Sequence, residues 1–346
     1  MSGHATIVMY HYVRDLTETR FPQIRGLTTS RFRAQIAYMR RFYRFVTLDE
    51  VSEACHGGRE LPENAALLTF DDGYSDHYLN VFPILDAEGI QGVFFPPVCA
   101  VRDRRVLDVN KVHFILASVA SAAALRREVF AELDRLRAEG YAIVSNDELY
   151  EKLAVRGDFD PPEVIFIKRL LQRELPQALR GAIVDALFRR HVSEDERTFA
   201  RELYMSEDQL RTMQKHGMAI GSHGTEHRWM NTLSPTEQRA EIESSLAFLD
   251  ELGVSRDAWT MCYPYGAHDA SLRAICAELG CKAAFTTAFD LARLEPEHAL
   301  TLARLDTNHL PQTADAAPDE WTTRVVPAAR SARPADPDAI QSMVRS

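Results

Sequence analysis

The chain has 346 residues, of which 46% are hydrophobic and 26% are charged, a composition typical of a globular protein. Fifty acidic against forty basic side chains give a net charge of -10, which argues against nucleic acid or an anionic membrane as a partner. The sequence contains no apolar stretch near the roughly 20 residues that span a bilayer, and the amino terminus lacks signal-peptide features.

The five cysteines are odd in number and form no CxxC pair: Cys55, Cys99, Cys262, Cys276 and Cys281. Such cysteines are typical of reduced thiols, so we expect a cytoplasmic protein.

The first hundred residues alternate between apolar strands and amphipathic helices, which predicts an α/β fold. Strands are expected at 6–12, 45–47, 65–70 and 92–96. Helices are expected after Ser30, from Leu48 to about Gly57, and over 78–88.

From about residue 106 to 204 helical periodicity dominates, and strand candidates are almost absent. We expect a mostly helical insertion in the βα repeat; a separate helical domain is the alternative. The alternation then resumes, with strands expected at 218–222, 259–263, 283–287 and 300–305. Helices are expected at 206–216, 234–252 and 270–279, the second beginning in a capping box of Ser234 and Glu237.

These patterns divide the chain into four parts. They are a first βα part (1–105), a helical insertion (106–204), a second βα part (205–310) and a tail (311–346). The tail is rich in Ala, Pro and Asp and lacks periodicity, so we expect it to be disordered or loosely docked.

The stretch AALLTFDDGY is an apolar strand that ends on two adjacent acids, Asp71 and Asp72, followed by Gly73. Two carboxylates this close resist joint ionisation, so something must compensate them, and a metal cation is the usual candidate. A surface turn is the plainer interpretation, since Asp and Gly are ordinary turn residues. The apolar strand that leads to these two acids favours a functional site.

The pentapeptide HGTEH places His223 and His227 four residues apart after another short strand. Two histidines with a nearby carboxylate fit a zinc site that keeps one position open for water. The letters also spell the inverted zincin motif, which needs a helix, and Gly221 and Gly224 count against one. Two unconnected surface histidines are the remaining alternative.

The segment CYPYG follows the strand at 259–263. Pro264 and Gly266 make a rigid turn that can aim a main-chain N–H into a cleft as an oxyanion donor. An ordinary loop with two packed tyrosines is the alternative.

In this order the three segments resemble the polysaccharide deacetylase family (NodB-like deacetylases, carbohydrate esterase family four), whose pattern is TFDDG, H-[S/T]-x-x-H and R-x-P-Y. The resemblance covers about residues 5–100 and 203–306. It implies a distorted (β/α) barrel with its site at the C-terminal ends of the strands. The helical segment between these ranges lies outside the family pattern.

The resemblance also implies roles for individual residues. Asp72, His223 and His227 would hold a divalent metal, expected to be Zn²⁺. Asp71 would be the general base, and the main-chain N–H of Tyr265 an oxyanion donor. The metal would lower the pKa of its bound water toward about 7.

Three positions depart from the family pattern. Gly224 replaces a Ser or Thr, and Cys262 replaces the arginine that orients the base. Arg304 is the expected substitute for that arginine. The late Leu-x-Leu-His segment, which supplies the general acid, is unmatched; His309 is the first candidate for that role and His11 the second.

We therefore expect a metal-dependent N-deacetylase that removes an acetyl or short acyl group from an amino sugar. A cytoplasmic setting favours a nucleotide-linked or lipid-linked sugar, or a glycan under construction for surface polysaccharide. Two alternatives keep the fold: hydrolysis of another small amide or imide, or glycan binding without catalysis.

Overall fold

The computed structural model describes residues 3–155 and 160–326 of the chain. These residues form two compact units. Of the described residues, the larger unit contains 3–15, 26–103 and 201–326, and the smaller unit contains 16–25, 104–155 and 160–200. No helix within the described ranges is both long and apolar enough to cross a membrane.

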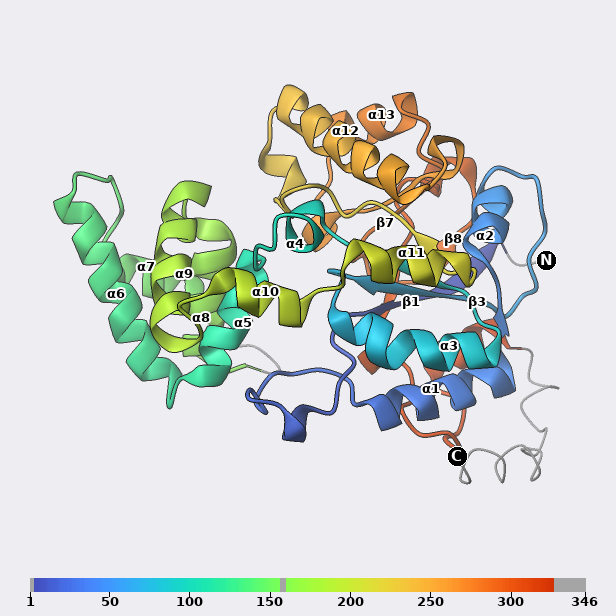
Figure 1. The fold of residues 1–346 in the computed structure, drawn as a ribbon, viewed down its shortest axis with the longest axis horizontal. Coiled ribbons are helices and arrows are strands. Elements are labelled where there is room, and N and C mark those ends of the chain that lie inside the picture. Colours follow the sequence, from blue (N-terminus) through green and yellow to red (C-terminus); the bar gives the residue numbers. More distant parts are fainter. Residues whose placement is uncertain (1–2, 156–159, 327–346) are drawn as a thin grey trace. The chain divides into compact units, whose positions relative to one another are not determined.

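Parallel strands form the centre of the larger unit (Figure 1). Strand β3 (Ala65–Asp71) lies between β1 (His4–Tyr10) and β4 (Gly92–Phe95), and every residue of β3 is buried. The seven-stranded sheet also contains β2 (Arg44–Phe45), β5 (Ala219–Ile220), β8 (Ala292–Arg293) and β9 (Leu305–Asp306). A parallel strand that is covered on both faces requires the continuous apolar run seen in β3.

A second sheet consists of β6 (Thr260–Cys262) and β7 (Ala283–Phe285). Single parallel bridges connect it to the first sheet, from Ser222 to Met261 and from Phe285 to Leu302. Strand β9 begins shortly after Leu302 and pairs with β1, the first strand of the larger sheet. The predicted α/β class with a large helical segment is confirmed. The strands form two sheets with isolated bridges between them, and the distorted barrel stays a prediction.

Helices surround these strands, and their ends follow the local sequence signals (Figure 1). The predicted capping box of Ser234 and Glu237 is present at the start of α12 (Pro235–Leu252), where Gly253 ends the helix in a left-handed conformation. Other helices of this unit include α1 (Thr29–Phe42), α2 (Leu48–Cys55), α3 (Phe82–Glu88), α4 (Val98–Val101), α11 (Glu207–Lys215) and α13 (Ala270–Glu278).

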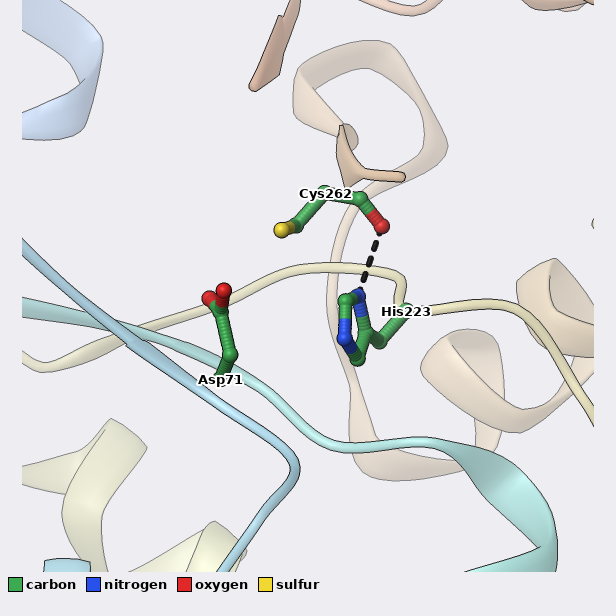
Figure 2. Close-up of side chains that lie close together, drawn as sticks. All are labelled: Asp71, His223 and Cys262. Atoms are coloured by element: carbon green, nitrogen blue, oxygen red, sulfur yellow. Dashed lines mark hydrogen bonds between the residues drawn. The ribbon is translucent and has the colours of Figure 1, made fainter. Parts of the chain in front are cut away.

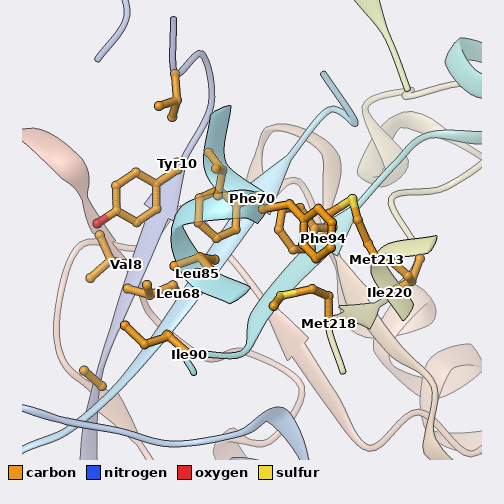
Figure 3. Packing of buried hydrophobic residues seen from close by; sticks show 14 of the residues in the cluster. Val8, Tyr10, Leu68, Phe70, Leu85, Ile90, Phe94, Met213, Met218 and Ile220 are labelled. Carbon is orange, nitrogen blue, oxygen red and sulfur yellow. The ribbon is translucent and has the colours of Figure 1, made fainter. Parts of the chain in front are cut away.

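The main hydrophobic core joins the two stretches of sequence that flank the smaller unit (Figure 3). Strands β1, β3 and β4 contribute aromatic and aliphatic side chains, and α11 and β5 cover them from the second stretch. The labelled members of this cluster are Val8, Tyr10, Leu68, Phe70, Leu85, Ile90, Phe94, Met213, Met218 and Ile220. The site is therefore built on a rigid, close-packed frame.

Within the described residues of the smaller unit, the regular secondary structure is helical. It contains α5 (Asp108–Ser118), α6 (Ala122–Ala138), α7 (Asn146–Leu153), α8 (Pro162–Arg169) and α9 (Gln177–His191); α10 (Glu196–Leu203) follows. Residues 16–25 also belong to this unit, because Phe21 packs against Phe114 and Phe199 with ring centroids 5.0 and 5.8 Å away.

The expectation of a disordered or loosely docked tail is wrong for residues 311–326. Helix α14 (Glu320–Val325) lies there, and Trp321, Val325 and Val326 belong to the main core. The buried hydroxyl of Thr322 lies 2.7 Å from the hydroxyl of Tyr38, so α14 is docked on α1. The rest of the predicted tail, 327–346, lies outside the described residues.

We predict that Gly221→Ala destabilises the larger unit. A Cβ there would lie 2.4 Å from Cε1 of Phe95 and 2.7 Å from Oγ1 of Thr260, and overpacking of this kind costs about 1–3 kcal/mol. Urea unfolding measures the loss. Gly3→Ala is the matched control, because a Cβ there meets no heavy atom within 4 Å. Equal unfolding midpoints for both variants would contradict the prediction.

Candidate functional site

The residues singled out by the sequence motifs meet at the C-terminal ends of the parallel strands. Asp71 is the last residue of β3, and Cys262 is the last residue of β6. His223 follows the bridge residue Ser222, just beyond β5. Because neighbouring strands are parallel, these ends meet at one edge of the sheet.

Asp72, His223 and His227 converge on one point. Oδ1 of Asp72 lies 3.5 Å from Nε2 of His223 and 3.3 Å from Nε2 of His227, and all three side chains are buried. The other carboxylate oxygen of Asp72 accepts a 2.6 Å hydrogen bond from the hydroxyl of Tyr74. Burial would raise the pKa of Asp72, but the two imidazoles hold it well below its usual range.

This group of residues has the donor atoms that a divalent cation requires. The three ligand atoms lie within 4.8 Å of one another, as two imidazole nitrogens and one carboxylate oxygen. Nδ1 of His223 lies 2.7 Å from the carbonyl oxygen of Cys262 and donates its N–H to it (Figure 2). The lone pair of Nε2 is therefore available to a metal ion. Nδ1 of His227 is buried without a hydrogen-bond partner among the described residues. The residues therefore fit a divalent metal ion.

Arg304 compensates the other carboxylate. Its Nη1 and Nη2 donate to the two oxygens of Asp71 at 2.9 and 2.8 Å, and both side chains are almost fully buried. Although burial alone would raise the pKa of Asp71, the guanidinium lowers it to about 2. The expected substitute for the missing arginine thus lies against Asp71.

Cys262 lies beside this ion pair. Nη2 of Arg304 lies 3.2 Å from Sγ of Cys262, and burial raises the pKa of the thiol, which stays neutral. Asp71, His223 and Cys262 form a second group of possible ligands. The guanidinium bonded to Asp71 and Cys262 makes that position unsuitable for a cation.

Glu241 of α12 holds the loop between the two histidines, a contact that the sequence motifs did not reveal. Its buried carboxylate accepts hydrogen bonds from the main-chain N–H groups of Thr225 and Glu226, both at 2.9 Å. A buried acid within an amphipathic helix is the one sequence signal that could have identified it. The loop is not helical, so the inverted zincin interpretation of HGTEH is wrong.

Tyr265 occupies a strained position beside the cluster. Its φ of 59° lies in the left-handed region, between Pro264 and Gly266. Its ring centroid lies 4.7 Å from that of His227 and 4.3 Å from that of Trp229, with the indole parallel to within 2°. Asp72 and His227 also have positive φ, of 69° and 52°. Strain of this kind clusters at functional sites.

The two candidate histidines lie in different places. Nε2 of His11 lies 4.0 Å from Oδ2 of Asp71, and its side chain is 41% exposed. The buried His77 donates from Nε2 to the carbonyl oxygen of His11 at 2.8 Å, which holds the end of β1. His309 is exposed and its ring lies 3.9 Å from that of Phe289; among the described residues no recorded contact joins it to Asp71 or Asp72.

Part of the chain is similar in sequence to known proteins. Residues 183–284 match the family model for polysaccharide deacetylase. Over 91 residues the chain is 42% identical to the poly-beta-1,6-N-acetyl-D-glucosamine N-deacetylase of Escherichia coli strain K12. That alignment covers 26% of this chain and only 13% of the relative.

Two solved structures share the fold. The deacetylase PplD of Streptococcus pyogenes, in complex with acetate, superposes with a TM-score of 0.55 at 16% identity, covering 90% of this chain and 95% of that one. IcaB from Ammonifex degensii superposes with a TM-score of 0.54 at 18% identity, covering 92% and 97%. The two structures show the fold, and the family model matches less than a third of the chain, in the part that contains the HGTEH and CYPYG segments.

We predict that Arg304→Met destabilises the protein, because Asp71 then stays buried without its cation. Removing one partner of a buried ion pair costs about 3–5 kcal/mol. Urea unfolding of Arg304→Met, Asp71→Asn and the double variant completes a mutant cycle. The double variant should be more stable than Arg304→Met alone. A double variant whose losses simply add would show that the pair is not coupled.

Proposed function

We propose that this protein is a metal-dependent N-deacetylase, which hydrolyses the amide of an N-acetyl or short N-acyl amino sugar and releases the carboxylic acid. The observation that carries the proposal is the unequal compensation of two adjacent acids. Asp72 lies against two imidazoles, whereas Asp71 is bonded to Arg304. One acid is therefore suited to bind a cation and the other to accept a proton.

Asp72, His223 and His227 would hold the cation, and their nitrogen and oxygen donors suit Zn²⁺. A divalent ion bound there lowers the pKa of its water and polarises a carbonyl oxygen. The hydrogen bond from His223 to the carbonyl of Cys262 fixes the tautomer and orientation of one ligand. Glu241 fixes the backbone between the two histidines, so the ligands are held in place before the ion binds.

Asp71 would act as the general base. Its bidentate bond to Arg304 keeps the carboxylate ionised and fixes its direction. It would accept a proton from the water whose oxygen attacks the amide carbon. The main-chain N–H of Tyr265 would donate to the carbonyl oxygen as negative charge develops on it.

His11 is the better-placed general acid of the two candidates. It lies near Asp71 at the end of β1 and is partly exposed, so it can reach a leaving amine. His309 has no such contact within the described ranges, and its ring packs on Phe289. His11 would give the nitrogen a proton as the carbon–nitrogen bond breaks, and the products would be an amine and a carboxylate.

The chemistry of the cysteines supports a reducing compartment. All five are buried free thiols. We infer a cytoplasmic setting, and with it a substrate that is still under construction, such as a lipid-linked or growing glycan. The E. coli relative is named for deacetylation of poly-beta-1,6-N-acetyl-D-glucosamine. Oligomers of N-acetylglucosamine are therefore the first substrates to assay.

We predict that Asp71→Asn lowers kcat for acetate release at least about a hundredfold while the variant still binds a divalent metal, because it removes the base and spares the ligands. Metal content is measured by mass spectrometry, and acetate by an enzymatic assay. The comparison variant His227→Ala should lose the metal as well as activity. Full activity in Asp71→Asn, or wild-type protein that binds no metal, would contradict the mechanism. A panel of small amides and imides tests the substrate class.

We predict that His11→Gln lowers kcat at least tenfold more than His309→Gln, because only His11 lies beside Asp71. A general acid contributes about 10²–10⁴-fold to the rate. His56→Gln, an exposed histidine elsewhere on the larger unit, is the control. The acid would be His309 instead if the order of the two effects were reversed.

A further inference from the structure

An exposed aromatic ring follows the C-terminal end of β7, at the edge of the sheet that carries the site. Residues 287–290 are all exposed, and Phe289 is 50% exposed. A single exposed apolar side chain is ordinary. This one differs because other rings hold it in place and because its loop is connected through Arg304 to Asp71, the proposed general base.

Two other rings hold Phe289. Its ring centroid lies 3.9 Å from that of His309, which is also exposed, and 4.8 Å from that of Trp321. Trp321 is buried and belongs to the main core. The guanidinium of Arg324 lies 4.5 Å from the indole centroid and pairs with Asp290 at 3.6 Å. Phe289 and His309 thus form a fixed aromatic surface over a buried indole.

The same loop is bonded to the residue that holds Asp71. The carbonyl oxygen of Thr286 accepts from Nε of Arg304 at 2.8 Å, and that of Ala288 accepts from the main-chain N–H of Arg304 at 2.9 Å. Phe289 follows directly. The aromatic surface is therefore tied in position to the Arg304–Asp71 pair.

We propose that Phe289 and His309, backed by Trp321, form a binding subsite for the sugar residue next to the one that is deacetylated. The ligand is a glycan of at least two pyranose units rather than a single sugar. A pyranose ring has an apolar C–H face that packs on an aromatic ring, while its hydroxyl groups stay in water. Both aromatic residues are exposed, which suits this ligand, and the inference rests on the proposed deacetylase function.

The test compares kcat/KM for acetate release from N-acetylglucosamine and from its di- and tetrasaccharides. Wild-type protein should prefer the oligomers. Phe289→Ala should reduce the ratio of tetrasaccharide to monosaccharide kcat/KM at least fivefold, mainly through KM, and Phe289→Tyr should restore it. Leu79→Ala, which removes another exposed apolar side chain (62% exposed), is the matched control and should keep the ratio. An equal loss at every length, or an unchanged ratio, would overturn the subsite.

Binding to Asp71→Asn, measured by calorimetry, separates this inference from the proposed function. If wild-type protein releases no acetate from any sugar, the proposed function fails. The subsite still stands if the tetrasaccharide binds Asp71→Asn at least fivefold more tightly than it binds the Asp71→Asn/Phe289→Ala double variant. It falls if both variants bind the tetrasaccharide equally, or if neither binds it.

Discussion

The site depends on keeping two adjacent, buried carboxylates ionised at the end of one strand. Like charges at this distance oppose each other, and burial penalises both. Arg304 compensates Asp71 with two hydrogen bonds, while Asp72 relies on two imidazoles and the hydroxyl of Tyr74. This difference gives the two acids separate chemistry, because a guanidinium orients a carboxylate whereas imidazole nitrogens can share a metal with one.

The guanidinium reaches Asp71 from Arg304, which directly precedes β9, and not from position 262, where the family motif has its arginine. The small side chain at Cys262 leaves room for it, and Sγ of Cys262 accepts from Nη2 of Arg304. Thr69 and the carbonyl of Thr286 accept from the same guanidinium. A buried arginine is tolerable only when its donors are satisfied in this way. What the site requires is a cation at this point in space, whichever residue supplies it.

Local signals in the sequence predicted the parts of the fold that local physics determines. The apolar run before Asp71, the capping box at Ser234 and the strand–helix alternation all depend on near neighbours. Residues 16–25 and helix α14 were missed because single aromatic side chains, Phe21 and Trp321, attach them through contacts distant in sequence. The carboxylate of Glu241 was missed for the same reason, since α12 meets the histidine loop only after folding. The average composition of a segment does not reveal a single side chain that anchors it to the core.

Three residues of the site adopt left-handed backbone angles at a cost of about 1–3 kcal/mol each. The strands beneath them are buried and close-packed, so the frame can hold a strained loop that would relax on a looser one. The loop after β7 has the opposite character, being exposed and anchored by one buried indole. Strained residues beside the proposed metal ligands favour one fixed geometry, whereas the exposed loop carries the proposed sugar subsite. The proposed chemistry and the proposed substrate selection thus lie on different loops.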